Sequence, residues 1–197
     1  SEPYVVYEQL AQLYDVVKIE ETDPALPENL DVLMIVHPKN ITSTLMYDID
    51  QYALNGGGLM VFVDPYAQND LPPGSTPGPG VQPGSSDLPK LFKAWGIKYR
   101  PNFWAGDLRY ALEVNSPSGP TRHVGILGLS NEAMSHQDVV TANLNGINAS
   151  TVGFFHREDE TTSQVQMEPL LFTSENSQPI SSLLLSTTTN VHTLLQN

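Results

Sequence analysis

The sequence contains no cysteine and few basic residues, and these two shortages exclude several classes of function. Without cysteine the chain can form no disulfide, no thiolate metal site and no cysteine nucleophile. Only 9 Lys and Arg stand against 22 Asp and Glu, which gives a net charge of −13. Because such a surface repels phosphate groups, we expect no nucleic-acid partner.

Long hydrophobic runs are also missing from the chain. No window reaches the roughly 18 consecutive apolar residues of a membrane helix. The N-terminus lacks the basic and apolar regions of a signal peptide. We therefore expect these 197 residues to be soluble by themselves. Both ends nevertheless look cut, since Ser1 almost directly precedes a predicted helix and residues 191–197 end without a turn or cap. A longer parent protein would explain both ends.

Apolar patterns in the first part of the chain predict a βαβ unit. Residues 30–36 and 59–64 are apolar runs typical of strands that are buried on both faces of a parallel sheet. Between them, Thr42 or Ser43 can cap a helix that ends at the glycines 56–58. Because strand, helix and strand follow one another through short connections, the two strands are predicted to lie parallel.

Further elements flank this unit. Residues 3–14 carry one apolar stripe and predict a helix, and residues 15–19 predict a short strand. Residues 87–95 predict another helix, followed by a strand at 97–99. We expect the helices around Leu10, Ile49 and Leu91 to pack on the faces of the sheet.

Two regions interrupt this alternation of helix and strand. Six prolines among glycines and serines at 65–86 predict an exposed, mobile loop. Beyond residue 105 the chain shows short strand-like segments separated by turn formers rather than by helices. These segments are residues 110–114, 122–127, 139–143, 152–155 and 165–172. The chain is therefore expected to form one α/β domain, with a sheet core at 1–105 and a β-richer continuation at 106–197.

Several sequence segments resemble one protein family. They are LPENLDVLMIVHPKN at 26–40, YDIDQY at 47–52, GGGLMVFVDP at 56–65, DLPKLFKAWGI at 87–97, and DVVTANL at 138–144 followed by Asn148. These segments are similar to the auxiliary components of uncharacterised ABC transport systems, a group linked to gliding motility in some bacteria. The likeness covers about the whole chain.

The resemblance implies a location, a set of partners and a fold. It implies a domain on the extracytoplasmic, periplasmic face of the bacterial cytoplasmic membrane, tethered by membrane helices of its parent protein. The transporter's membrane and ATPase subunits would be its partners. The implied fold is an open, mainly parallel α/β sheet of the Rossmann-like or flavodoxin-like kind, related to the glutamine-amidotransferase-like group. The family supplies no established catalytic residues to carry over.

No catalytic, cofactor or metal motif is evident in the sequence. The glycines 56–58 leave a helix and enter a strand, which is the reverse of the order in a phosphate-binding loop. The chain has no Gly-x-Ser-x-Gly pentapeptide for a serine nucleophile. Its five histidines lack the short spacings of metal ligands. We therefore predict a protein that is not an enzyme and holds no cofactor or metal.

Polar residues directly follow the two central strands. Ligands of open α/β sheets bind beyond the carboxyl ends of the strands, where this sequence places His37 with Lys39 and Asp64 with Tyr66. Lys39 could pair with an anion, Asp64 could accept hydrogen bonds from hydroxyl or amine groups, and Tyr66 could stack on a sugar. The alternative is that Asp64 merely caps the loop and Lys39 is solvated.

Three hypotheses on function follow from these patterns. The first is a non-catalytic extracytoplasmic module that serves an ABC transporter by binding a ligand or by scaffolding. The second is a degenerate or unrecognised hydrolase on an amidotransferase-like fold, acting on a sugar or a peptide. The third is a purely structural interaction domain. The sequence itself does not choose between ligand capture and scaffolding.

Overall fold

The computed structural model describes residues 5–76, 80–116, 119–157 and 165–187. By its internal contacts the chain divides into two compact units. Residues 1–34 and 40–60 form the first, and residues 35–39 and 61–197 form the second.

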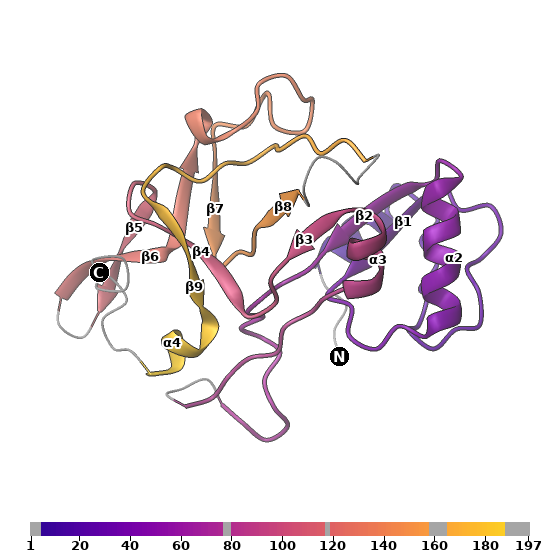
Figure 1. Ribbon diagram of the computed structural model, residues 1–197, viewed down its shortest axis with the longest axis horizontal. Helices are drawn as coiled ribbons and strands as arrows, with labels where there is room; N and C mark the ends of the chain where they lie inside the picture. The colour runs from indigo at the N-terminus through magenta and orange to yellow at the C-terminus, as the bar shows by residue number, and fades with distance from the viewer. Residues whose placement is uncertain (1–4, 77–79, 117–118, 158–164, 188–197) are drawn as a thin grey trace. The chain divides into compact units, whose positions relative to one another are not determined.

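A βαβ unit occupies the end of the first unit and the chain that directly follows it. Strand β1 (Val32–Val36), helix α2 (Ser43–Leu54) and strand β2 (Gly58–Phe62) follow one another, and β1 and β2 pair as a parallel two-stranded sheet (Figure 1). Thr42 caps α2, because its hydroxyl accepts a hydrogen bond from the Leu45 amide at 3.3 Å. Gly56 follows the helix at a φ of 86°, which glycine adopts without steric cost. The predicted βαβ unit and its parallel pairing are confirmed.

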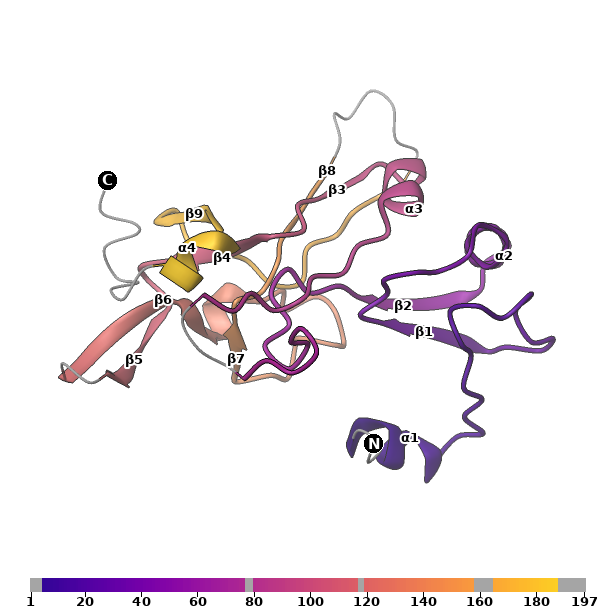
Figure 2. The same cartoon turned by 90° about the horizontal axis from the view of Figure 1, so that it is seen from below.

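The prediction that these strands are buried on both faces is wrong. Side chains of β1 alternate, so that Leu33 is only 6% exposed while Val36 is 62% exposed. In β2 the pattern is similar, with Phe62 at 50%. Helix α2 lies beside the strand pair (Figures 1 and 2), and its Leu45 and Ile49 are buried. A sheet of two strands with one covering helix buries one face only, and the side chains then alternate.

The N-terminal segment also departs from its prediction. Helix α1 (Val5–Ala11) forms where a helix was predicted, but none of its described residues is buried. The expectation that the helix around Leu10 packs on a sheet face is therefore wrong. Residues 15–19 form no strand in the structure.

The second unit is built from short antiparallel sheets (Figure 1). Helix α3 (Pro89–Ala94) leads into β3 (Ile97–Tyr99), which pairs antiparallel with β8 (Phe155–Arg157). Strand β4 (Phe103–Asp107) pairs antiparallel with β9 (Ser177–Ser181), which runs into helix α4 (Ser182–Thr187). A three-stranded antiparallel sheet contains β5 (Ala111–Ser116), β6 (Gly119–Ser130) and β7 (Gly146–Ser150), with the 3-10 turn η1 (Asn131–Ala133) directly after β6.

The predicted open, mainly parallel sheet of the Rossmann-like, flavodoxin-like or glutamine-amidotransferase-like kind is therefore wrong. The fold is mixed α/β, and its sheets are small and mostly antiparallel. Connection length explains the difference, because parallel neighbours need a crossover of about a dozen residues or more. Strand β5 ends at Ser116 and its sheet neighbour β6 begins at Gly119, which leaves no room for a crossover helix between them.

The predicted strand segments of the second half have mixed outcomes. Residues 110–114 and 122–127 correspond to β5 and β6, and 152–155 runs into β8. Residues 139–143 form turns instead of a strand. Within 165–172, only Leu171 is recorded in a β-bridge, with Met134 as its partner.

Two apolar clusters and one buried carboxylate hold the second unit together. Trp104, Ala111, Val124 and Ile180 form one cluster, and Leu127, Leu129, Ala133 and Met134 form the other. The Asp107 side chain is 0% exposed and accepts hydrogen bonds from the backbone amides of Arg109 at 2.8 Å and Ser174 at 2.6 Å. It therefore ties the end of β4 to a segment 67 residues further along the chain.

Candidate functional site

Two of the four predicted site residues, His37 and Lys39, contact Asp70, which was not among the predicted site residues. His37 lies directly after β1, and its Nε2 is 3.2 Å from Oδ2 of Asp70. The Lys39 ammonium donates to the same carboxylate oxygen. His37 has a φ of 51°, in the left-handed region that few residues other than glycine adopt, and its amide donates to the Phe62 carbonyl at 2.8 Å.

The Asp70 carboxylate anchors the base of the proline-rich loop. The Ala67 amide donates to the Gly84 carbonyl at 2.9 Å, and the Gly84 amide donates to the Asp70 carbonyl at 2.7 Å. A Cβ at Gly84 would collide with the Asp70 carboxylate, so this close approach requires glycine. Hydrogen bonds from Lys39 and then from His37 lower the pKa of Asp70. The carboxylate is therefore an ionised anchor at neutral pH. The mobility predicted for the loop as a whole stays a prediction.

Asp64 and Tyr66 form a turn at the end of β2. The Asp64 carboxylate accepts a hydrogen bond from the Tyr66 amide at 2.7 Å, and the Asp64 amide donates to the Ser86 hydroxyl at 2.9 Å. The Ser86 amide in turn donates to the Asp64 carbonyl at 2.9 Å. Asp64 thus caps the loop, as the alternative reading of the sequence had it, whereas Lys39 binds Asp70 instead of being merely solvated. Partial burial raises the pKa of the Tyr66 phenol.

Both nitrogens of the His37 ring are turned toward protein. Nε2 faces Asp70, and Nδ1 is buried without a hydrogen-bond partner among the described residues. Serines at the end of the loop are engaged elsewhere, since the Ser85 hydroxyl donates to Asn102 at 3.1 Å and the Ser86 hydroxyl accepts from Asp64. A general base needs a nitrogen within reach of the proton it abstracts. In this arrangement Nε2 of His37 is engaged by Asp70 and Nδ1 is buried.

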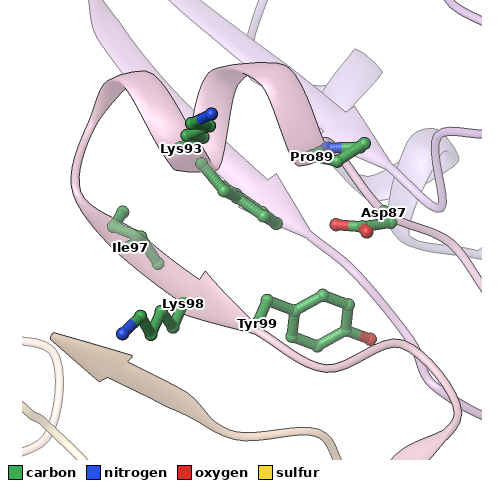
Figure 3. A pocket seen from close by; sticks show the side chains of 7 residues that line it. Asp87, Pro89, Lys93, Ile97, Lys98 and Tyr99 are labelled. Atoms are coloured by element: carbon green, nitrogen blue, oxygen red, sulfur yellow. The ribbon is translucent and has the colours of Figure 1, made fainter. Parts of the chain in front are cut away.

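A pocket that the sequence reading missed lies between α3 and β3 (Figure 3). Its volume is about 210 Å³, and it is lined by Asp87, Pro89, Phe92, Lys93, Ile97, Lys98 and Tyr99. Figure 3 shows Asp87 and the Tyr99 hydroxyl at one end, with Ile97 and the two lysines toward the other. The pocket therefore has an acidic end, a basic end and an aromatic wall.

The aromatic side chains that line this pocket contact one another and a further ring outside the lining. Phe92 makes edge contacts with Tyr99 and Phe155, with ring centroids 5.9 Å and 5.8 Å apart. Burial raises the pKa of the Tyr99 phenol, and the nearby Asp64 and Asp87 carboxylates raise it further. Burial also raises the pKa of Asp87, although the Leu88 amide donates to its carboxylate at 2.7 Å. The acidic end of the pocket therefore disfavours a further negatively charged group.

A signal for this pocket was available in the sequence. Four of the nine basic residues of this acidic chain fall within residues 90–100, namely Lys90, Lys93, Lys98 and Arg100. The apolar spacing of the same helix was interpreted as core packing alone. Leu91 and Phe92 are indeed buried, while Lys93 is one of the residues that line the pocket.

Within the described residues, no group of three or more His, Cys, Asp or Glu side chains could hold a metal ion. None of the helices described there is both long and apolar enough to span a bilayer.

Fold and sites together define a mixed α/β protein with polar and aromatic surface sites. The comparison with protein families is more specific. The family model described as ABC-type uncharacterized transport system matches residues 1–196. The chain belongs to this family and is an auxiliary component of an ABC-type transport system. Neither the curated proteins nor the solved structures gave a match.

Proposed function

We propose that the chain is a non-catalytic domain that serves its ABC transport system from the extracytoplasmic, periplasmic side, by binding a ligand or by scaffolding. Its parent protein is membrane-tethered and contacts the membrane and ATPase subunits of the transporter. In species that glide, the system contributes to gliding motility. Membership in the family over residues 1–196 supports the transport role.

One observation carries the non-catalytic part of this proposal. The imidazole of His37 is held between Asp70 and the protein interior, with a buried Nδ1. A hydrolytic base would need an accessible nitrogen beside a nucleophile. His37 and Asp70 instead join the end of β1 to the loop, which is a structural use of the pair. The net charge of −13 further supports partners other than nucleic acid.

A substrate panel tests for catalysis. Ester, amide and glycoside substrates are assayed with the wild type, with His37→Ala and with Asp64→Ala. We expect no turnover above background for any of the three proteins. Turnover that is lost in either variant, while circular dichroism stays unchanged, would establish the hydrolase alternative.

The absence of cysteine permits a direct test of location. Val139 is 84% exposed, so Val139→Cys introduces one reactive thiol into these residues of the full-length parent protein. Intact spheroplasts are treated with a membrane-impermeant maleimide, and the labelled peptide is identified by mass spectrometry. We expect labelling before lysis. Labelling only after lysis would place the domain in the cytoplasm and refute this part of the proposal.

The transport role is tested at the predicted site. We propose that the region of His37, Lys39, Asp64 and Tyr66 contacts a ligand or a transporter subunit. Cells carrying the four-alanine variant should show reduced transport and weaker co-purification with the transporter subunits. Lys90→Ala serves as a control on the exposed side of α3. Normal transport in the four-alanine variant, at equal protein level, would exclude this site.

A further inference from the structure

We propose that the pocket between α3 and β3 binds a small zwitterionic ligand of amino-acid size. Asp87 would face the ligand's ammonium group, Lys93 and Lys98 its carboxylate, and Phe92 its apolar side chain. This inference goes beyond the proposed function, since it concerns a different site and names a ligand class. It rests on the proposed function only for its biological use.

The charges of the pocket are separated along its length. Asp87 lies at one end and Lys98 runs toward the opposite end (Figure 3). Opposite charges at the two ends of a pocket attract a ligand that carries both signs, and they repel a ligand whose single charge meets the wrong end. A zwitterion carries a charge opposite to that of each end.

The acidic end suits a cation in particular. Asp87 is half-buried, and within the described part of the chain the Leu88 amide is the donor to its carboxylate. The Tyr99 hydroxyl behind it is buried and has no hydrogen-bond partner there. Two carboxylates, Asp64 and Asp87, act electrostatically on this phenol. An ammonium group placed here would offset their combined negative potential.

The size and wall of the pocket limit the ligand further. At about 210 Å³ the space is smaller than the roughly 300 Å³ at which pockets begin to hold drug-sized ligands. Phe92, Pro89 and Ile97 supply the apolar part of the lining. The ring of Phe92 is fixed by its contacts with Tyr99 and Phe155. An aliphatic or aromatic amino acid fits these three properties.

Calorimetric titration of the 197-residue chain tests the proposal with defined probes. L-leucine and L-phenylalanine carry both charges, L-leucinamide lacks the carboxylate, and N-acetyl-L-leucine lacks the ammonium group. We expect the two amino acids to bind at least about tenfold more tightly than either analogue, because each analogue lacks one of the two charges that the pocket ends attract.

Two variants assign the ends of the pocket. Asp87→Asn keeps an oxygen to accept from the Leu88 amide and removes the charge. It should weaken leucine binding about tenfold and abolish the preference for leucine over N-acetyl-L-leucine. Lys98→Met should abolish the preference for leucine over leucinamide. Asp15→Asn and Lys90→Met make the same charge changes outside the lining residues and should leave both preferences intact.

Three outcomes would overturn the proposal. They are no binding of leucine and phenylalanine up to their solubility limits, equal binding of leucine and its analogues, and full binding by Asp87→Asn. Each concerns the purified chain and leaves its association with the transporter untouched. Conversely, leucine binding that depends on Asp87 would stand even if the spheroplast labelling placed the domain elsewhere.

Discussion

The indole of Trp104 lies directly against the backbone of Gly125. A Cβ at position 125 would come within 2.5 Å of Cζ3 of this ring, and Trp104 itself is 0% exposed. The two residues belong to β4 and β6, which are in separate sheets of the same unit. The absence of a side chain on Gly125 is therefore what allows the largest core residue to fit.

Gly125→Ala is expected to destabilise the protein by about 1–3 kcal/mol, since the ring or the strand must shift to admit the methyl group. Urea unfolding followed by tryptophan fluorescence measures the change. Gly146→Ala on β7 is the matched control, because the nearest atom to its Cβ would be the Leu129 carbonyl oxygen at 3.3 Å. If Gly125→Ala cost no more than Gly146→Ala, the tight contact would be incorrect.

Replacing Asp107 should be among the costliest single changes in the second unit. Its carboxylate accepts from the amides of Arg109 and Ser174 and from the Ser174 hydroxyl at 2.8 Å. Asp107→Ala leaves these partly buried donors without their acceptor, so we expect a loss of about 3 kcal/mol in the free energy of unfolding.

Asp107→Asn, which keeps one oxygen acceptor, should cost less than Asp107→Ala. Asp15→Asn, at an exposed position, should stay within about 0.5 kcal/mol of the wild type. Similar midpoints of urea unfolding for all three variants would contradict the anchoring role of Asp107.

Loss of the Asp70 anchor should expose the proline-rich loop to proteases. Asp70→Ala is expected to raise the rate of cleavage within residues 66–86 several-fold at neutral pH, because the loop base loses its bonds to His37 and Lys39. Mass spectrometry of limited digests locates the cuts. The exposed neighbour Asn69 provides the control variant, Asn69→Ala. Equal cleavage of the two variants would show that the anchor does not restrain the loop.

The same anchor predicts a dependence on pH. The pKa of Asp70 is lowered in the folded state by Lys39 and His37, so the unfolded state binds its proton first as the pH falls. The stabilisation is complete above the ordinary carboxyl pKa of 3.8 and is lost as the pH falls through the lower folded value. An acid protease should therefore cleave the loop of the wild type rapidly only at pH values below 3.8. Release already at pH 5 would contradict the assignment.

His123 should add a second, separate dependence on pH. Burial lowers its pKa below 6.5, and its Nδ1 accepts a hydrogen bond from the Gly125 amide at 3.2 Å. As the pH falls through 6.5, the unfolded state takes up this proton before the folded state, so stability decreases. The difference in urea midpoint between about pH 8 and pH 5.5 should shrink in His123→Gln. His156→Gln, at an exposed position, should keep the wild-type difference.

Much of the first hundred residues could be predicted from local patterns. The cap at Thr42, the apolar runs of β1 and β2, and the glycine after α2 act within a few residues of one another. Such signals depend on backbone conformation and on short-range hydrogen bonds, which the sequence displays directly. The same patterns wrongly predicted burial of both sheet faces, because burial depends on which distant elements of the chain pack against the sheet.

The candidate sites show the same limit. Lys39 and His37 follow β1, as predicted, but their partner Asp70 lies 31 and 33 residues away in a loop that was predicted only to be exposed and mobile. The pocket at Asp87 and Tyr99 depends on a turn of α3 back onto β3, and its helix was interpreted only as a packing element.

Sequence alone therefore determined the family, the βαβ unit and the residues at the ends of its strands. Tertiary structure decided that the remaining strands pair antiparallel, that Asp64 caps a loop, and that the Asp70 carboxylate binds the side chains of His37 and Lys39. The physical reason is the separation along the chain between the residues that interact. Helix caps and strand patterns are fixed by neighbours along the chain, whereas the contact of Asp107 with Ser174 spans 67 residues and forms only when the whole unit closes its core.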